Sequence, residues 1–374
     1  MSLSKVLGLV NLHVNTELGE MTETRPLGVI SFLSRYALMD FSLSNLSNSG
    51  IDKIGIICPE FPQSVLKHIG NGTSWTANTK TGLLSLMYSE RGILNPKTNT
   101  DIRIINENDW LIKRVEPEYI IVSPSHVVCN IDFEKVLEKH IEQRADVTIV
   151  YVNTDKLDKE YSNSPVLTIS DSGLVSKISV NISKKKTGNA SLEMYIISRK
   201  SFNSIISVEE NISPTYGIAE MIANLHENKK LKVFGHLFDG YVRIVNSLSQ
   251  YHRVSLELLD HYKRDELFRE NAPILTTTHN TPPSQYGPSA NVKHSFIANG
   301  AEINGAVEGS IISRNVTISK GAFIKNCILF NGAYIGPNVI LENVIVDKQT
   351  TINSKQELRG SSENPIYIKR GVKV

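Results

Sequence analysis

Apolar residues follow two different spacings along this chain, and the spacing changes near residue 290. Before that point, short apolar runs alternate with segments whose apolar residues recur every three or four positions, which predicts alternating strands and helices. The predicted strands are 6–10, 53–58, 119–123, 145–152 and 230–237, and the predicted helices are 42–51, 62–70, 133–144 and 216–227. This alternation favours a mixed, mostly parallel sheet covered by helices on both faces, which binds ligands at the carboxyl ends of its strands.

A helical pattern over 247–270 closes the first part of the chain. It is followed by prolines spread among Thr, Ser and Asn: Pro273, Pro282, Pro283 and Pro288. Proline interrupts a helix because it lacks an N–H donor and clashes with the preceding turn, so this run is typical of a connector. We therefore predict an α/β domain, a proline-rich linker and a second domain over 1–270, 271–290 and 291–374.

An aliphatic residue recurs every six positions beyond the linker. The rows are Ile297–Ile303, Ile312–Ile318–Ile324 and Leu329–Ile335–Leu341, and the step from Ile345 to Ile352 comes close to six. Small or turn-forming residues fill the intervals, as in NGAE and GPNV. This repeat predicts a left-handed parallel β-helix, in which each hexad forms one flat face of a coil and the aliphatic side chains stack inside. A β-sandwich would need alternation with period two and hairpin turns, which the sequence does not fit.

Composition narrows the class of protein further. The 374 residues exceed one ordinary domain, and 40 Lys+Arg against 38 Asp+Glu leave a formal charge of only +2, which favours neither nucleic acid nor an anionic membrane as partner. Cys58, Cys129 and Cys327 lie far apart in apolar strings, which predicts reduced core thiols. The N-terminus has no secretory pattern, and no window approaches ~18 uninterrupted apolar residues, so we expect a cytoplasmic protein.

The segment RYALMDFSLSNLSNSGIDKIGII, residues 35–57, carries a resemblance to a known family. It is similar to the K-[YF]-R-[LI]-I-D-F-x-L-S-N-x-x-N-S-G-I segment of bacterial glucose-1-phosphate adenylyltransferases, the ADP-glucose pyrophosphorylases. The likeness extends along the whole chain to the terminal repeats. It implies a Rossmann-like nucleotidyltransferase (GT-A-like) domain before the β-helix. It also implies a reaction that joins ATP and glucose 1-phosphate into ADP-glucose and pyrophosphate, for which catalytic chains use Mg²⁺.

The residues that would bind the triphosphate are replaced. The family's glycine-rich G-G-x-G-x-R-L aligns with 12–18, where all three glycines are lost and the arginine becomes Glu17. A side chain at such a position blocks the close approach of backbone N–H groups to phosphate, and a carboxylate repels it. In the family's R-A-K-P-A-V-x-F-G-G, Arg25 and Phe32 are kept, while the lysine is Leu27 and the Gly-Gly pair is Leu33-Ser34.

The residues that would bind the metal and the sugar phosphate are replaced as well. The two metal-binding aspartates of the family align with Ser125 and Ile244, and neither side chain offers an anionic oxygen. No lysine aligns with the family's sugar-phosphate lysine near 180–182, although the Lys184–Lys186 triplet follows and is interpreted as a solvated loop. We therefore expect no catalytic residue, no metal site and no cofactor.

A chain with this scaffold but without these residues resembles the regulatory subunit that Firmicute-type bacteria carry for this enzyme. The resemblance implies a catalytic glucose-1-phosphate adenylyltransferase subunit as partner, in a hetero-oligomer that we expect to be a heterotetramer. It also implies an anionic metabolite as effector. Arg25, Arg35 and Arg243 are the candidates for binding it, because a guanidinium clamps phosphate with a fixed fork of donors.

Other hypotheses stay open at this point. The chain could be a weakly active sugar nucleotidyltransferase with rearranged metal ligands, with Asp132 as a candidate base, although an aspartate before a helix is typically an N-cap. It could be a stand-alone sensor of a sugar phosphate or nucleotide. A hexapeptide acyltransferase would need a histidine in the coils, and His294 stands only at their edge.

Four further residues lie near the expected cleft without a decisive motif. His13 and His126 have no carboxylate or metal-binding neighbours in the sequence, so we interpret them as structural. Glu193 and Glu220 fall in regions that the family uses for sugar contacts, but the accompanying residues are missing, and both are interpreted as ordinary acids.

Overall fold

The computed structural model describes residues 5–13, 18–76, 82–90, 98–162, 164–181, 185–207 and 215–374. These residues form two compact units. Unit 1 comprises Met1–Asn15, Met39–Ile244 and Arg269–Leu275, and unit 2 comprises Thr16–Leu38, Val245–Phe268 and Thr276–Val374. The segments alternate along the chain, so the domain boundaries drawn from the sequence stay a prediction about which parts fold independently.

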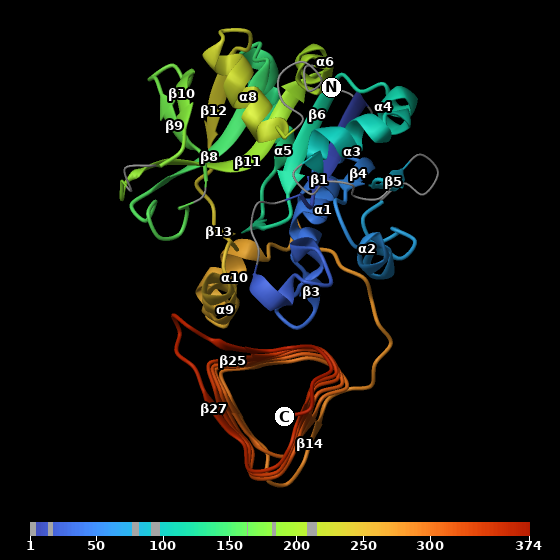
Figure 1. Ribbon diagram of the computed structural model, residues 1–374, viewed down its shortest axis with the longest axis vertical. Helices are drawn as coiled ribbons and strands as arrows, with labels where there is room; N and C mark the ends of the chain where they lie inside the picture. The colour runs from blue at the N-terminus through green and yellow to red at the C-terminus, as the bar shows by residue number, and fades with distance from the viewer. Residues whose placement is uncertain are drawn as a thin grey trace. The chain divides into compact units, whose positions relative to one another are not determined.

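Unit 1 is built on a mixed sheet, which has nine strands within the described residues (Figure 1). At its centre β1 (Val6–Asn11) lies parallel to both β4 (Lys53–Ile57) and β6 (Tyr119–Pro124). The other strands of this sheet are β5 (Leu83–Met87), β8 (Val147–Thr154), β9 (Val166–Ile169), β10 (Val175–Ser179), β11 (Gly188–Ser198) and β12 (Val233–Leu237). The five strands predicted from apolar runs are confirmed. The eleven-residue β11, antiparallel to β6 and β8, is not among them.

Helices pack on both faces of this sheet (Figure 1). They are α1 (Met39–Asn48), α2 (Pro62–Ile69), α3 (Asp101–Glu107), α4 (Trp110–Val115), α5 (Phe133–Glu142), α6 (Arg199–Ser207) and α8 (Ile218–Glu227). The four helices predicted in this part are confirmed, although α1 begins three residues earlier than the predicted start at 42. Gly8 allows α1 to pack closely on β1, because a Cβ placed there would lie 2.8 Å from the side chain of Leu46.

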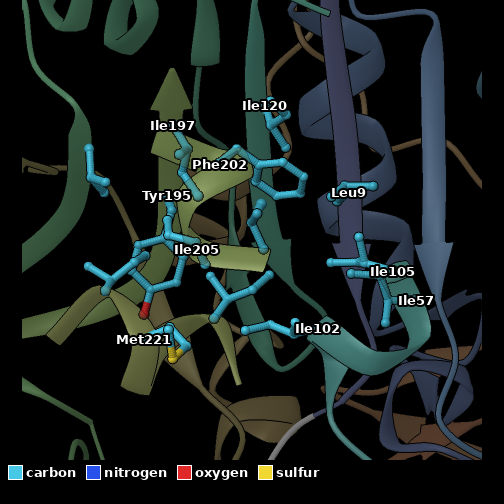
Figure 2. Packing of buried hydrophobic residues seen from close by; sticks show 14 of the residues in the cluster. Leu9, Ile57, Ile102, Ile105, Ile120, Tyr195, Ile197, Phe202, Ile205 and Met221 are labelled. Carbon is cyan, nitrogen blue, oxygen red and sulfur yellow. The ribbon is translucent and has the colours of Figure 1, made fainter. Parts of the chain in front are cut away.

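One buried apolar cluster joins the sheet to the helices on its other face. Figure 2 shows Leu9 and Ile120 of the central strands facing Phe202 and Ile205 of α6, with Met221 of α8 beside them. Each of these side chains is fully or almost fully buried. Burial of a large apolar side chain contributes about 1.5 to 3 kcal/mol, so this cluster holds the helices firmly against the sheet.

Polar residues set the starts of two helices. The Asp132 carboxylate accepts a hydrogen bond from the N–H of Glu134 at the start of α5, which confirms the N-cap interpretation. Thr100 caps α3 in the same way, by accepting from the N–H of Arg103. A second, two-stranded sheet pairs β7 (Val127–Cys129) with β13 (Val242–Ile244).

Unit 2 contains the β-helix. Three parallel sheets form the sides of a triangle in Figure 1. Their strands are β14 (Gln285–Tyr286), β17 (Glu302–Ile303), β20 (Thr317–Ile318), β23 (Tyr334–Ile335) and β26 (Thr351–Ile352); β15 (Asn291–Lys293), β18 (Ala306–Glu308), β21 (Phe323–Lys325), β24 (Ile340–Glu342) and β27 (Glu357–Arg359); and β16 (Phe296–Ile297), β19 (Ile311–Ile312), β22 (Ile328–Leu329), β25 (Val344–Val346) and β28 (Ile366–Ile368). The left-handed parallel β-helix predicted from the hexads is confirmed.

The hexad spacing predicts that Ile345 points into the coil, and this prediction is wrong. Val346, not Ile345, pairs with Leu329 and joins the interior cluster. Ile345 belongs to the outer row of the same sheet with Ile311 and Ile328, and this outer row is nonetheless buried. The row is buried because other segments of unit 2 cover this side of the coils.

Helix α9 (Leu248–Glu257) supplies contacts of this kind. The His252 Nε2 lies 2.7 Å from the carbonyl oxygen of Asn326, and the rings of Tyr251 and Phe330 meet edge to face. The single helical pattern predicted over 247–270 is wrong in one respect, because the helix ends at Glu257 and a separate α10 (His261–Leu267) begins after Asp260, which caps it. The segment before α1 also belongs to this unit and contains the short strands β2 (Ser31–Phe32) and β3 (Tyr36–Ala37).

The three cysteines are buried free thiols, as predicted. Burial raises the pKa of each thiol to about 12, so they stay protonated and unreactive at neutral pH. Among the described residues, no helix is both long and apolar enough to cross a lipid bilayer.

Candidate functional site

The two positions aligned with the family's metal-binding aspartates come together in unit 1. Ile244 pairs with Val127, which is two residues beyond Ser125. Both Ser125 and Ile244 are buried. A hydroxyl and an aliphatic side chain do not fit Mg²⁺, which prefers carboxylate and phosphate oxygens. Within the described ranges, no three His, Cys, Asp or Glu side chains lie together as a metal ion would require.

The phosphate-binding positions of the family are occupied by apolar or non-glycine residues where the structure describes them. Residues 14–17, including Glu17, and residues 182–184 lie outside the described residues. Leu27, at the family's lysine position, is buried in a 3₁₀ turn over Leu27–Val29. Leu33 and Ser34 have φ values of 48° and 63°, in the left-handed region that favours glycine. The backbone thus keeps a glycine-type conformation at the aligned Gly-Gly pair, although both glycines are lost.

A small cleft of about 80 Å³ opens at the carboxyl ends of β1 and β6. Its polar side chains are Asn11, His13, Asp101, Glu193, Tyr195, Thr215 and Glu220. The structure therefore brings together Glu193, Glu220 and His13, which the sequence left as isolated residues near the expected cleft. Three carboxylates line this cleft, so we call it the acidic cleft.

Asp101 is the buried carboxylate of the acidic cleft. It accepts hydrogen bonds from the Asn11 side chain (2.8 Å) and from the backbone N–H groups of Ile102 (2.8 Å) and Ile218 (3.0 Å). Burial raises the pKa of this carboxyl despite these donors. Its bonds connect β1, α3 and the start of α8, which is a structural role.

Glu220 also has a structural role. Its Oε2 accepts a hydrogen bond of 3.0 Å from the N–H of Gly217, in the capping-box arrangement at the start of α8. Gly217 is confined between the two acids, because a Cβ there would lie 2.8 Å from the Asp101 Oδ1 and 3.1 Å from the Glu220 Oε2.

Glu193 enters the acidic cleft from a bulge in β11, where the register against β8 shifts between Ser191 and Met194. Burial, together with the nearby carboxylates of Glu220 and Asp101, raises the pKa of the Glu193 carboxyl to about 7. The His126 Nε2 lies 4.0 Å from the Glu193 Oε1. Burial lowers the pKa of His126 to about 4, so this imidazole is neutral at pH 7 and does not compensate the carboxylate.

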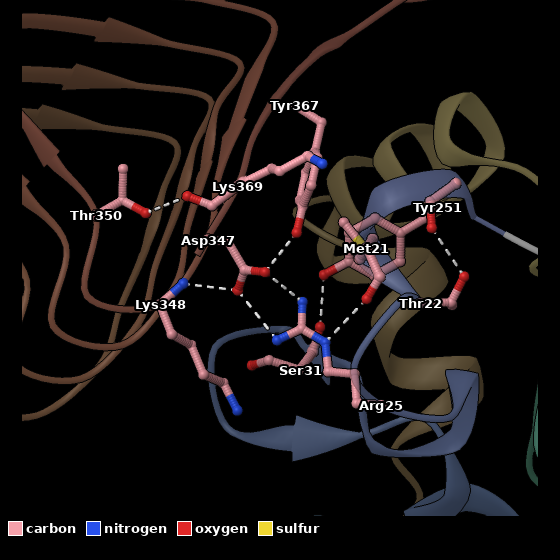
Figure 3. Close-up of polar contacts among 11 residues, drawn as sticks. Met21, Thr22, Arg25, Ser31, Tyr251, Asp347, Lys348, Thr350, Tyr367 and Lys369 are labelled. Carbon is pink, nitrogen blue, oxygen red and sulfur yellow. Dashed lines mark hydrogen bonds and ion pairs between the residues drawn. The ribbon is translucent and has the colours of Figure 1, made fainter. Parts of the chain in front are cut away.

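Arg25, one of the three predicted effector-binding arginines, is buried in unit 2. Its Nη1 and Nη2 donate to the two carboxylate oxygens of Asp347 at 3.1 Å and 2.6 Å, and its Nε donates to the Met21 carbonyl (Figure 3). The Tyr367 hydroxyl donates to the same carboxylate. The planar fork of Arg25 is therefore used inside the protein.

Arg243 belongs to unit 1, whereas Arg25 and Arg35 belong to unit 2. On β13, the Arg243 Nη1 donates to the carbonyl of Val242, and its guanidinium lies 4.8 Å from the ring centroid of Tyr241. Within unit 2, Arg35 lies in a pocket that does not include Arg25 but includes two arginines that sequence reasoning missed.

Those two are Arg264 on α10 and Arg314 on the β-helix, which line a pocket of about 420 Å³ together with Arg35. We call it the arginine pocket. Its lining comes from the turn between β2 and β3, from α10, from 278–279 and from the β-helix coils, all within unit 2. None of the three arginines forms an ion pair with a carboxylate in the described ranges.

The positive charges of Arg35 and Arg314 in the arginine pocket repel each other. Burial and the neighbouring Arg35 lower the pKa of Arg314. The Arg264 guanidinium lies over the ring of Phe296, 5.3 Å from its centroid. A bound anion would relieve the repulsion between Arg35 and Arg314, and arginine forks match phosphate and carboxylate geometry. No local sequence signal marks this pocket, because its arginines are far apart along the chain.

A nucleotidyltransferase-type α/β unit combined with a hexapeptide β-helix defines the class of this protein. A nucleotidyl transferase family model matches residues 15–233, and a model described as GlmU-like, C-terminal hexapeptide matches residues 282–363.

Relatives that match most of this chain show to which members of this class it is similar. Glycogen biosynthesis protein GlgD of Geobacillus stearothermophilus is 30% identical over 98% of this chain and 97% of its own, and GlgD of Bacillus subtilis (strain 168) is 29% identical over 99% and 97%. Glucose-1-phosphate adenylyltransferase of Mycoplasma mobile is 29% identical over 83% of this chain and 82% of its own. The chain therefore belongs to the nucleotidyl transferase family, in the branch that contains the GlgD proteins and the glucose-1-phosphate adenylyltransferases.

Proposed function

We propose that this chain is a regulatory subunit of glucose-1-phosphate adenylyltransferase in glycogen biosynthesis and does not catalyse the reaction by itself. The observation that carries this proposal is the pair Ser125 and Ile244, buried at the positions of the family's metal-binding aspartates. Loss of even one preorganised stabilising group costs about 10²- to 10³-fold in rate. The printed names of the full-length relatives support the assignment to glycogen biosynthesis.

The subunit acts through association with a catalytic homologous chain, as a heterotetramer. It shifts that chain between two quaternary states, for which a free-energy difference of about 1 to 3 kcal/mol suffices. Flat β-helix faces are suited to subunit contacts, and the exposed side chains of Phe323 and Tyr334 on two of these faces support association through unit 2.

An anionic metabolite tunes this association by binding in the arginine pocket. Of the three arginines predicted from the sequence, the proposal keeps Arg35, and it adds Arg264 and Arg314. Arg25 contributes indirectly, because its ion pair with Asp347 holds the segment before β2 against the β-helix.

The test is ADP-glucose synthesis from ATP, glucose 1-phosphate and Mg²⁺, with the purified chain alone and after addition of a catalytic adenylyltransferase chain. We expect no product from the chain alone, and in the mixture a new complex in size-exclusion chromatography together with a changed rate. Robust synthesis by the chain alone would overturn the proposal in favour of rearranged metal ligands. A mixture with unchanged complex size and rate would also overturn it and favour a stand-alone sensor.

A further inference from the structure

The three carboxylates of the acidic cleft differ in what holds them. Asp101 accepts hydrogen bonds that connect three elements, and Glu220 caps α8. The Glu193 carboxylate accepts no hydrogen bond from any residue that the structure describes, and the only ion-pair contact found for it there is with His126, at 4.0 Å. Asp101 and Glu220 thus have structural roles, and Glu193 has none that these contacts reveal.

The backbone of Glu193 makes this side chain costly. Its φ is 54°, and its N–H bonds to the hydroxyl of Ser191 at the bulge of β11. The left-handed region costs an L-residue about 1 to 2 kcal/mol, whereas glycine adopts it freely. A glycine would therefore satisfy the bulge better than glutamate does, and the carboxylate is present at the expense of stability.

The position of this carboxylate determines what it does to a ligand. About two thirds of the side chain is covered, and the carboxyl lies in the cleft at the carboxyl ends of β1 and β6, where this type of sheet binds ligands. Above pH 7, where the Glu193 carboxyl is mostly ionised, a phosphate ester entering there meets a negative charge that accepts no hydrogen bond from a described residue. Like charges brought together at a binding site oppose association strongly.

We propose that Glu193 is the specificity-determining residue of the acidic cleft, and that its carboxylate disfavours phosphate esters relative to uncharged sugars. This inference deepens the proposed function and rests on it, because only a non-catalytic subunit can have a cleft that disfavours the sugar phosphate of the reaction. Replacement of Glu193 removes its share of the repulsion without removing a structural contact, whereas Asp101 and Glu220 stay in the cleft.

The experiment measures binding of glucose 1-phosphate and of glucose to the full chain by calorimetry. The variants are Glu193→Gln, which removes the charge, and Glu193→Gly, which removes the charge and the strain. Glu142→Gln, which neutralises an exposed acid at the end of α5, is the matched control. At pH 8, where a carboxyl with a pKa of about 7 is mostly ionised, we expect both Glu193 variants to bind glucose 1-phosphate about tenfold more tightly than the wild type, and glucose with unchanged affinity.

The outcomes separate the two proposals. Folded Glu193 variants that bind glucose 1-phosphate no better than the wild type, or that gain as much affinity for glucose, would overturn the proposed role of Glu193. The same would follow if Glu142→Gln matched them. ADP-glucose synthesis by the wild-type chain would overturn the proposed function instead, whatever the binding results. Circular dichroism checks that each variant is folded, and agreement between Gln and Gly ensures that neither result depends on one side chain.

Discussion

The acidic cleft of unit 1 and the arginine pocket of unit 2 carry opposite charge. Asp101, Glu193 and Glu220 line the first, and Arg35, Arg264 and Arg314 line the second. The net charge of +2 conceals this contrast, because the two local clusters cancel in the sum. The difference teaches that anion binding by this chain is expected at the β-helix unit and not at the end of the sheet, where nucleotidyltransferases perform their chemistry.

The two regions also differ in how buried charge is compensated. In unit 2 the buried Arg25 is neutralised by a bidentate pair with Asp347, whereas in unit 1 no cation is paired closely with Glu193 among the residues described. Four predictions use this difference, from the largest expected effect to the smallest.

Substitution of Asp347 by alanine is expected to lower the free energy of unfolding by about 3 to 5 kcal/mol, because it leaves a buried guanidinium uncompensated. Urea denaturation of the full chain measures the loss. Glu357→Ala breaks an exposed ion pair with Arg359 on the β-helix and should cost less than about 1 kcal/mol. Equal losses for the two variants would contradict a structural role for the Arg25–Asp347 pair.

Removal of positive charge from the arginine pocket should weaken anion binding. Arg35→Ala and Arg314→Ala are each expected to raise the Kd for pyrophosphate about tenfold, because each removes charge-assisted hydrogen bonds. Calorimetry measures the Kd, and Arg359→Ala is the control for an arginine of the same unit outside the pocket. If the control weakens binding as much as the pocket variants, pyrophosphate binds unit 2 non-specifically.

The free energy of unfolding should change with pH because of the Glu193 carboxyl in unit 1. The pKa of Glu193 is raised from 4.5 to about 7 in the folded state, so the folded chain retains this proton more strongly than the unfolded chain does. Stability from this group is then present at low pH and lost as the pH rises through about 7. His13, His126, Asp101 and Glu220 face Glu193 and are the same in both proteins, so a comparison of wild type with Glu193→Gln isolates the contribution of Glu193.

The expected result is that the melting temperature of Glu193→Gln relative to wild type increases from pH 5 to pH 8. Thermal unfolding in matched buffers measures it. A constant difference across this range would mean that Glu193 keeps an ordinary carboxyl pKa and is fully solvated.

The smallest expected effect is the gain in stability when a residue with left-handed backbone is replaced by glycine, which distinguishes backbone strain from charge at Glu193. Glu193 and the exposed Arg144 have φ values of 54° and 48°, so Glu193→Gly and Arg144→Gly should both relieve left-handed strain and stabilise the chain by roughly 1 kcal/mol. At pH 5, where Glu193 is mostly protonated, the two gains should be similar. At pH 8 the gain for Glu193→Gly should be larger, and identical gains at both pH values would show that charge plays no part.

The hexad rows and the first strands of the sheet could be predicted because they depend on local spacing. Ile318 and Ile335 mark the coils of the β-helix, since side chains that point inward at each turn must be apolar wherever the coil lies. The match around Asp40 to Ile51 indicated the family for a similar reason, because it is one continuous segment. The error at Ile345 arose where the repeat departs from six residues and an outer face is buried as well.

Contacts between residues far apart in the chain decided the rest. Arg25 meets Asp347 across 322 positions, and no pattern around either residue indicates the other. Arg35, Arg264 and Arg314 form one pocket only because the turn between β2 and β3, α10 and a β-helix coil meet in unit 2. A charge becomes compensated, buried or available to a ligand through its neighbours in space. Periodicity therefore predicts which elements form, and tertiary packing determines which charges can act.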